Sequence, residues 1–474
     1  MRRFDRLGLL HALLAGLALL LAAAWLWRCW CLFPLLGWNE IRLAPAFMLA
    51  HGVSPYPPAL GGPATTWIYG PLPILLLLPA TLATGAGGAL LIAGFINILV
   101  TLAGIAAVCG WLAVSDGDRD PAGRLAAFAA CVAFWPMTTF QFVQSDNAAL
   151  AFGLLSLVCL QGSGTSRARW LAAGACAAAI ACKQTLLSLA LAECAYLAIR
   201  DGARPCLTQG LRIGLLTVAA YGTAALAFGP AALGFHLLTL PASLPWAPSP
   251  GARIAEFWSD LLEQSVVPLA VLACLGSRAW RRHSPWLLPA IAWAASWPLD
   301  FTALLKNGGS INSMHGWLFF LPAAATLCVQ KTRSQGARCL ILAAAAAMLA
   351  FRVATVGPGV WQPRRQMLRE GEFLARSLPG QIYFPWHPLV TFYAEGRFDH
   401  VEDGLYIQTL ARRPATGAAM RAYLPPRLHV MAFANLEMDW GIARALIPPG
   451  AQQTTFGAWT LYSWLPPTDS DSSH

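Results

Sequence analysis

The chain has 474 residues, of which 57% are hydrophobic and only 11% are charged, and its mean hydropathy is +0.54. A soluble globular domain carries roughly 25% charged residues, so this composition predicts a membrane protein. The apolar portion from Leu7 to Phe351 has room for about a dozen helices of about 20 residues each, which excludes a single-pass receptor and a peripheral enzyme. A β-barrel is excluded because the apolar segments are long and continuous instead of alternating.

The formal net charge of +10 includes 32 basic residues, of which all but three are Arg. Most of them lie in short loops between apolar runs, where they act as topology signals, so nucleic acid is not expected as a partner. The 12 Cys show no disulfide framework and no CxxC metal pair. The basic first residues and the apolar run through Trp27 predict an uncleaved first helix with a cytoplasmic N-terminus.

Arginine-rich loops are expected in the cytoplasm, and four loops qualify: Ser163–Arg169, Arg200–Arg212, Ser277–His283 and Lys331–Arg338. The segments between them then form hairpins whose tips lie on the outer face: Gln141–Asn147, Lys183–Gln184, Pro230–Arg253 and Asp300–His315. The proline-rich segment Pro71–Leu82 is expected to be shallow or re-entrant, and Gly88–Val114 to cross the membrane. The chain is thus predicted to be an all-α polytopic domain of about 11–13 transmembrane helices over residues 1–356.

An odd number of crossings places the C-terminus outside. We therefore expect a multi-pass protein of a bacterial inner membrane, with a small extracytoplasmic α/β domain at residues 357–467 and a disordered tail at 468–474. In this domain, the charges of 364–372 predict a helix, and the apolar runs Gln381–Phe384 and Leu389–Tyr393 resemble strands.

Two of the three Lys, Lys183 and Lys306, fall at predicted outer tips, where the positive-inside rule disfavours them. Each alone is explained by an interfacial anchor, but the two together predict an anionic group between them. A phosphate suits an ammonium group, which is a compact charge with three donors. The stretch from Asn307 to Asn312, Asn-Gly-Gly-Ser-Ile-Asn, adds backbone amides that suit the same ligand.

Carboxylates on the outer face are the other signal. The first outer loop, 38–67, opens with Asn39-Glu40-Ile41-Arg42 and continues as a helix that ends near Gly52. Glu40 either caps this helix or serves as a general base or divalent-metal ligand at the membrane surface. Asp146 begins a later helix, where N-capping is the alternative to a binding role. The outer histidines, His51, His236 and His315, lack metal-ligand spacing.

Four short motifs follow one another here: Asn-Glu-x-Arg in the first outer loop, Met-Leu-x-x-Gly, Tyr-Pro-Pro and Tyr-Gly-Pro-Leu. In these motifs the sequence resembles polytopic glycosyltransferases of the C superfamily (GT-C). Within this superfamily, the motifs are most similar to those of protein O-mannosyltransferases and lipid A aminoarabinose transferases. Gln144-x-Asp146-Asn147, Ala-Cys-Lys183-Gln and Lys306-Asn-Gly-Gly with Asn312 continue the resemblance, which spans residues 1–351.

The resemblance implies transfer of a sugar from a polyprenyl-phosphate carrier to a lipid, glycan or protein on the outer face. Glu40 would be the general base or support a divalent metal ion, although the family often has Asp-Glu where this chain has Asn39-Glu40. Lys183 and Lys306 would hold the carrier phosphate. The expected substrate contacts are Asn39, Arg42, Tyr69, Gln144, Asp146, Asn312 and His315.

Two other classes stay open. A transporter or lipid flippase usually shows internal repeats and midplane charges, whereas the polar groups of this chain gather at one face. A catalytically inactive assembly protein with the same scaffold is the other alternative, because Asn39 stands where the family often has Asp.

Overall fold

The protein is described from a computed structural model. The structure describes residues 6–32, 37–59, 61–65, 67–115, 127–129, 131–133, 135, 143–162, 165–273, 287–331, 335–355, 361–412, 421–434 and 442–464. The predicted tail at 468–474 lies outside these residues, as do parts of the predicted cytoplasmic loops.

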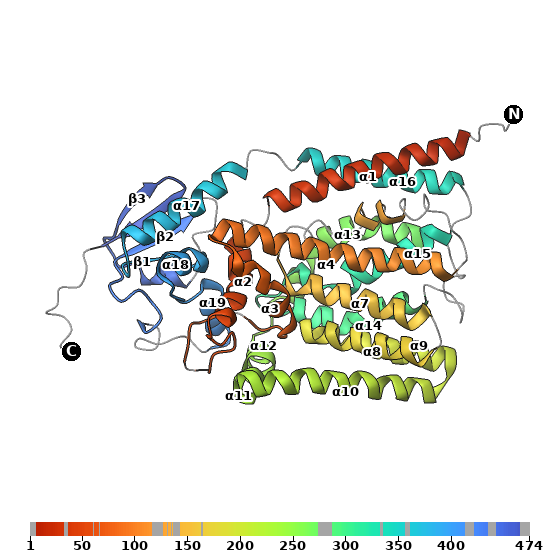
Figure 1. The fold of residues 1–474 in the computed structure, drawn as a ribbon, viewed down its shortest axis with the longest axis horizontal. Coiled ribbons are helices and arrows are strands. Elements are labelled where there is room, and N and C mark those ends of the chain that lie inside the picture. Colours follow the sequence, from red (N-terminus) through yellow and green to blue (C-terminus); the bar gives the residue numbers. More distant parts are fainter. Residues whose placement is uncertain are drawn as a thin grey trace.

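The membrane region is a bundle of long helices that run along one common direction (Figure 1). They are α1 (Arg6–Leu32), α4 (Ala86–Ser115), α7 (Ser145–Gly162), α8 (Ser166–Cys182), α9 (Leu187–Asp201), α10 (Ala203–Phe228), α13 (Pro250–Ala273), α14 (Leu287–Leu304), α15 (Leu321–Lys331) and α16 (Gln335–Thr355). Within the described residues, α1, α4, α10 and α16 are long and apolar enough to cross a membrane. The predicted all-α polytopic membrane region is confirmed, while the number of crossings stays a prediction because several connecting segments lie outside the described residues.

Small residues allow the central helices to approach closely. Helix α7 packs against both α4 and α8, and a Cβ atom on Gly104 would lie 2.8 Å from the Cα atom of Ala151. In lipid, where the hydrophobic effect does not drive helices together, close contact of this kind contributes van der Waals attraction between them. Helix α10 lies at the edge of the bundle, where its leucines are exposed, such as Leu211 at 74% and Leu226 at 91%. This face is expected to contact lipid.

Short elements cluster at the end of the bundle that faces the C-terminal region, where Figure 1 labels α2, α3, α11 and α12. They are α2 (Gly37–Ala50), α3 (Leu72–Leu77), η1 (Leu78–Leu82), η2 (Gln184–Leu186), α11 (Pro230–Gly234), η3 (Phe235–Thr239), α12 (Leu240–Ser243), η5 (Ile311–Ser313) and η6 (Gly316–Phe320). The described parts of the predicted outer tips therefore share one end, while residues 141 and 142 lie outside the described residues.

Several local predictions agree with these elements. Helix α2 ends at Ala50 and is followed by Gly52 with a φ of +73°, the left-handed conformation that glycine adopts at a helix end. Helices α3 and η1 are too short to cross a bilayer, as expected for the proline-rich segment. Helices α8 and α9 form a hairpin that turns at Lys183 and Gln184.

The C-terminal region contains α17 (Trp361–Ser377), β1 (Ile382–Tyr383), α18 (Pro388–Glu395), α19 (Glu402–Leu410), β2 (Val430–Ala434), η8 (Ala443–Leu446), β3 (Gln452–Phe456) and β4 (Trp459–Ser463). Its sheet has the order β1-β2-β4-β3, in which β1 and β2 are parallel and the other pairs antiparallel. Strand β2 is buried along its whole length, whereas β3 is an exposed edge. The predicted small α/β domain is confirmed in its fold.

One predicted strand, Leu389–Tyr393, is instead the middle of helix α18. Pro388 occupies the first turn, where its missing N–H costs nothing. The N–H of Leu389 is bonded to the carboxylate of Glu40, which is far away in the sequence. Gly396, with a φ of +68°, ends the helix by donating its N–H to the carbonyl of Phe392 at 2.7 Å. Tertiary capping thus overrides the strand-like pattern.

The C-terminal region is firmly docked on the membrane region. The N–H of Ala86, at the start of α4, donates to Glu372 of α17 at 3.0 Å. The carbonyl of Ala64 accepts the N–H of Val401 at 3.0 Å, and the N–H of Ala64 donates to Nδ1 of His400 at 2.7 Å. Apolar residues of α2, α4, α17, α18 and the sheet form one continuous core. The two regions therefore share an interior at this end of the bundle.

Gly404 tests this docking, because a Cβ atom there would overlap the carbonyl of Ala64 and the neighbouring backbone. We expect Gly404→Ala to lower the free energy of unfolding by about 1–3 kcal/mol, as for other overpacked sites. Gly174→Ala is the matched control, since a Cβ atom at this helical glycine meets nothing within 4 Å. Thermal unfolding in detergent measures both, and equal melting temperatures for the two variants would contradict the tight contact.

Candidate functional site

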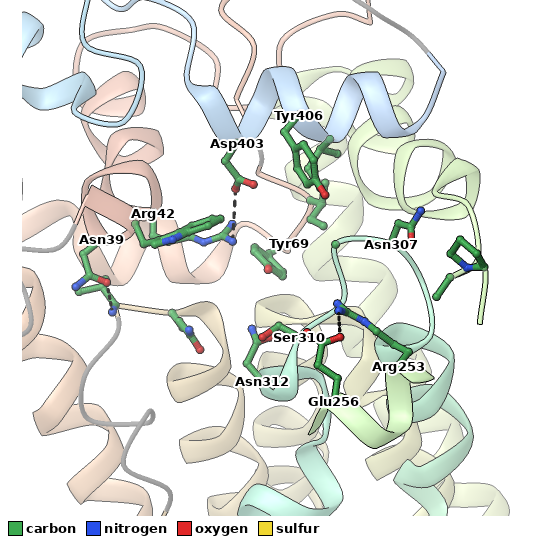
Figure 2. Close-up of a pocket in the computed structure, with 18 of the residues that line it drawn as sticks. Asn39, Arg42, Tyr69, Arg253, Glu256, Asn307, Ser310, Asn312, Asp403 and Tyr406 are labelled. Carbon is green, nitrogen blue, oxygen red and sulfur yellow. Dashed lines mark hydrogen bonds and ion pairs between the residues drawn. The ribbon is translucent and has the colours of Figure 1, made fainter. Parts of the chain in front are cut away.

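A cavity of about 730 Å³ lies where the bundle end meets the C-terminal region. Its walls come from α2 (38–42), residues 68–69, residues 143–144, the start of α13 with the preceding loop (247–256), residues 307–312 and α19 (403–407). Figure 2 shows α19 above the cavity and α13 at one side. The cavity is thus built from segments that are far apart in the sequence.

Arg42 occupies one end of this cavity. Its Nη2 atom is 3.6 Å from Oδ2 of Asp403, and its guanidinium group lies over the rings of Tyr69 and Trp38, at 5.2 and 5.8 Å from their centres. Its Nη1 atom is buried and has no hydrogen-bond partner among the described residues. A buried donor without an acceptor is costly. This end of the cavity therefore suits a ligand with an oxygen acceptor.

Arg253 lies at the other end, on the first turn of α13 (Figure 2). Its Nη1 atom is 2.7 Å from Oε2 of Glu256, and Nη2 donates to the carbonyl of Gly309. Its Nε atom is buried and has no hydrogen-bond partner within the described part of the chain. Ser249 caps the helix, since its hydroxyl oxygen accepts the N–H of Ala252 at 3.3 Å. A long helix N-terminus beside a guanidinium group favours an anion.

Helix α19 reaches the cavity because its start is held on two sides. Glu402 accepts the N–H groups of Ile442 and Ala443, the latter at 2.8 Å, and donates its own N–H to the carbonyl of Pro385. Burial raises the pKa of Glu402, whereas these backbone donors lower it. Asp403 and Tyr406, one turn apart, consequently face the cavity.

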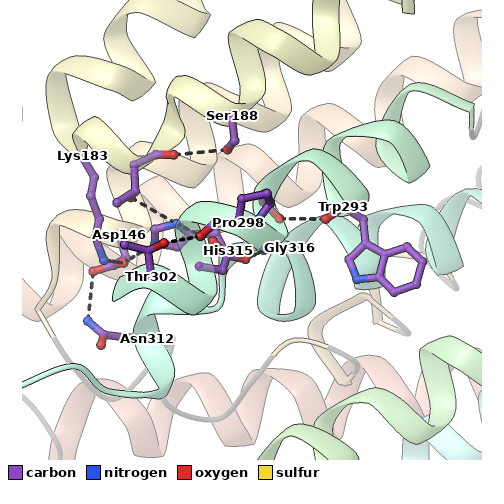
Figure 3. A network of polar contacts seen from close by, with 12 residues as sticks. Asp146, Lys183, Ser188, Trp293, Pro298, Thr302, Asn312, His315 and Gly316 are labelled. Atoms are coloured by element: carbon purple, nitrogen blue, oxygen red, sulfur yellow. Dashed lines mark hydrogen bonds and ion pairs between the residues drawn. The ribbon is translucent and has the colours of Figure 1, made fainter. Parts of the chain in front are cut away.

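Asp146 lies behind the cavity, at the centre of a buried polar network (Figure 3). Its Oδ1 atom accepts from Nζ of Lys183 at 2.6 Å and from Nε2 of His315 at 2.7 Å. Its Oδ2 atom is 3.5 Å from Nδ2 of Asn312, which lines the cavity. Nδ1 of His315 is 3.7 Å from a carboxylate oxygen of Asp300. The positive charge of Lys183 is thus paired with a carboxylate of the protein itself.

Lys306 lies elsewhere. Its ammonium group donates to the carbonyls of Pro241 and Ala242, both at 2.9 Å, and lies 5.5 Å from the ring centre of Trp246. Neither Lys183 nor Lys306 lines the cavity. The expectation that the two ammonium groups surround one anionic ligand therefore has no support in this geometry, because each has a partner of its own.

Glu40 also lies outside the cavity lining, although Asn39 and Arg42 belong to it. Its side chain is 0% exposed. Oε1 is 2.6 Å from Nδ1 of His387 and Oε2 accepts the N–H of Leu389 at 3.1 Å. These contacts join α2 to α18, so the predicted role of Glu40 as the base stays a prediction without geometric support.

Five predicted substrate contacts do come together in the cavity lining: Asn39, Arg42, Tyr69, Gln144 and Asn312. Asp146 and His315 stand behind them. The main residues that sequence reasoning missed are Arg253, Glu256, Asp403 and Tyr406. Arg253 carried the same signal as the two lysines, a cation on the outer face, whereas nothing in one sequence places α19 above the cavity.

The structure also bears on metal binding. Within the described residues, no group of three His, Cys, Asp or Glu side chains converges to hold a metal ion. The divalent cation expected beside Glu40 therefore stays a prediction with no ligand set assigned.

Comparison with solved structures shows which fold this is. The chain superposes on ArnT from Cupriavidus metallidurans bound to undecaprenyl phosphate with a TM-score of 0.61 and 11% identity, over 95% of this chain and 97% of that one. The apo structure of ArnT gives a TM-score of 0.61 and 12% identity over 93% and 96%. The archaeal oligosaccharyltransferase AglB from Archaeoglobus fulgidus, in complex with an inhibitory peptide and a dolichol-phosphate, gives 0.50 and 11% over 90% and 69%.

No protein-family model matches the sequence, and no curated protein sequence matches it significantly. ArnT and AglB are both GT-C glycosyltransferases. The chain is therefore a multi-pass membrane protein with the GT-C fold, and the resemblance seen in its short motifs is confirmed for the fold.

The Lys183–Asp146 pair predicts a large effect on stability. Lys183→Met leaves a buried carboxylate without its cation, so the free energy of unfolding should fall by about 3–5 kcal/mol. Adding Asp146→Asn should restore part of the loss, because the uncompensated charge is removed. Lys306→Met is the matched control, since the acceptors of its ammonium group within the described residues are neutral carbonyls. Chemical unfolding in detergent measures all three, and independent effects of Lys183 and Asp146 would contradict a coupled pair.

Glu40→Gln separates the two roles considered for this residue. If Glu40 braces α18, the variant should have a lower melting temperature and faster amide exchange at residues 388–395, because an amide has one acceptor oxygen where the carboxylate has two, for His387 and the N–H of Leu389. Hydrogen exchange with mass spectrometry measures this directly. Unchanged exchange and stability together with lost sugar transfer would instead support the general base.

Proposed function

We propose that this protein is a membrane glycosyltransferase that moves a sugar from a polyprenyl-phosphate carrier to a lipid, glycan or protein acceptor. The reaction takes place in the cavity beneath α19, on the outer face of a bacterial inner membrane. The observation that carries the proposal is a cavity with a guanidinium group at each end, each with a buried N–H donor that has no partner among the residues that the structure describes. The bound undecaprenyl phosphate of ArnT and dolichol-phosphate of AglB support this class of donor.

Arg253 and the N-terminus of α13 hold the carrier phosphate. Exposed apolar residues adjoin this part of the lining in the chain: Trp246, at 57%, precedes Ala247, and Trp258, at 48%, and Leu262, at 41%, follow Glu256 on α13. An isoprenoid tail needs such a surface to pass from the lipid to a polar site. As the bond between C1 of the sugar and the phosphate oxygen breaks, negative charge grows on the phosphate, and Arg253 stabilises it.

The sugar lies between the two arginines. Amide and hydroxyl groups line this part of the cavity and offer both donors and acceptors to a ring with several hydroxyls: Asn39, Gln144, Asn307, Ser310, Asn312 and Tyr406. The rings of Trp38 and Tyr69 supply apolar surface on one side. Asp146 and His315 support this wall through Asn312 instead of binding the sugar directly.

Lys183 and Lys306, expected at first to hold the phosphate, take structural roles in this proposal. Lys183 keeps Asp146 in place. Lys306 fastens the loop between α14 and η5 to α12. The acceptor enters from the outside beneath the C-terminal region, which is extracytoplasmic in this proposal.

Carrier binding tests the proposal without knowledge of the sugar. We expect the purified protein to bind undecaprenyl phosphate, and Arg253→Ala to weaken binding about 10–100-fold, as for loss of a charged hydrogen-bond donor. Native mass spectrometry or calorimetry measures it.

Arg204→Ala, an exposed arginine at the turn between α9 and α10, is the control and should bind normally. Sugar release from a panel of synthetic undecaprenyl-phosphate hexoses and pentoses then identifies the donor. A folded wild-type protein that binds no polyprenyl phosphate contradicts the proposal.

A further inference from the structure

Transfer of a sugar to a hydroxyl group requires a base, because the acceptor oxygen loses its proton as it attacks C1. Within the described part of the chain, two carboxylates line the cavity, those of Glu256 and Asp403. Glu40 is buried against His387 and Leu389. Asp146 has one oxygen shared by Lys183 and His315. The choice is thus between one carboxylate on α13 and one on α19.

Glu256 stands beside the leaving group. It lies on the same helix as Arg253, three residues further on, and its carboxylate is 2.7 Å from the guanidinium group that holds the carrier phosphate in the proposed function. Its side chain is 55% exposed. A carboxylate in this position balances the charge of Arg253 but lies on the side from which the phosphate departs.

Asp403 stands opposite. Figure 2 shows it pointing down from α19 at the Arg42 end of the cavity, across from Arg253 and Glu256. Its side chain is only 6% exposed, and Nη2 of Arg42 lies 3.6 Å from its carboxylate. In a direct displacement at C1 the attacking oxygen approaches from the face opposite the leaving phosphate. Asp403 is on the side where that oxygen must arrive.

We propose that Asp403, carried by the C-terminal region, is the general base of the transfer. Its carboxylate takes the proton of the acceptor hydroxyl while the oxygen forms a bond to C1. The bond from C1 to the phosphate oxygen breaks, and its electron pair stays on the phosphate, next to Arg253. The product has the opposite configuration at C1. This assignment rests on the proposed function and makes α19 part of the catalytic apparatus.

Tyr406 follows one turn later on α19 and lines the same wall. Its hydroxyl group is a hydrogen-bonding group close to Asp403 in the chain, so it is suited to orient the acceptor. In this arrangement the membrane region supplies the donor site and the C-terminal region supplies the groups that meet the acceptor.

The test compares two nucleophiles with one donor, the member of the undecaprenyl-phosphate sugar panel from which wild type releases sugar. Water needs a base to attack, whereas azide is already an anion and does not. We expect Asp403→Asn to reduce hydrolysis by about 100-fold or more, the scale of general-base catalysis. Formation of the glycosyl azide should stay within about threefold of wild type, with inverted configuration by NMR.

Asp399→Asn is the matched control, since it removes another buried carboxylate of the same region that does not line the cavity. It should leave both reactions unchanged. Binding of undecaprenyl phosphate and the melting temperature show that each variant is folded.

Three results overturn the assignment: hydrolysis and azide reaction falling together in Asp403→Asn, neither falling, or a selective loss of hydrolysis in Glu256→Gln instead. A wild-type protein that forms neither free sugar nor glycosyl azide from any donor refutes the transferase function itself. The assignment of Asp403 then falls with it, and this outcome is recognised because wild type is inactive.

Discussion

The buried contact between Glu40 and the start of α18 is the constraint on which the cavity end of the bundle depends. A carboxylate without solvent is stable only when its oxygens are bonded, and here both are used, by His387 and by the N–H of Leu389. The contact fixes α2 against the C-terminal region. Because Arg42 lies half a turn further along α2, the same contact sets the distance between Arg42 and Asp403, and with it the width of the cavity at that end.

Behind the cavity, too, a buried charge is paired within the protein. The carboxylate of Asp146 is bonded to Lys183 and His315 inside the bundle, so the charges of this ion pair face each other and not the cavity. The two arginines differ, since each pairs with one carboxylate and still keeps an N–H that no described residue accepts. The cavity is therefore close to neutral when empty and still able to bind an anion at either end.

Much of this arrangement was accessible from the sequence. Hydropathy and the positions of Arg predicted the helical membrane region and brought Asn39, Tyr69 and Asn312 to one end of it. The partners of these residues were not accessible, because they depend on packing between distant segments. Glu40 and His387 are 347 positions apart, and no local pattern connects them. For the same reason α18 was mistaken for a strand, since the carboxylate that caps it lies in the first outer loop.

The position of α19 in the chain has a consequence for biosynthesis. Residues 403–407 follow every helix of the membrane region in sequence, so they are made after the bundle has been inserted. Until they fold, the cavity has a floor and side walls but no cover, and neither Asp403 nor Tyr406 is present. A growing chain therefore cannot form the complete site before α19 has been synthesised, and a chain that stops before α19 leaves a bundle without one.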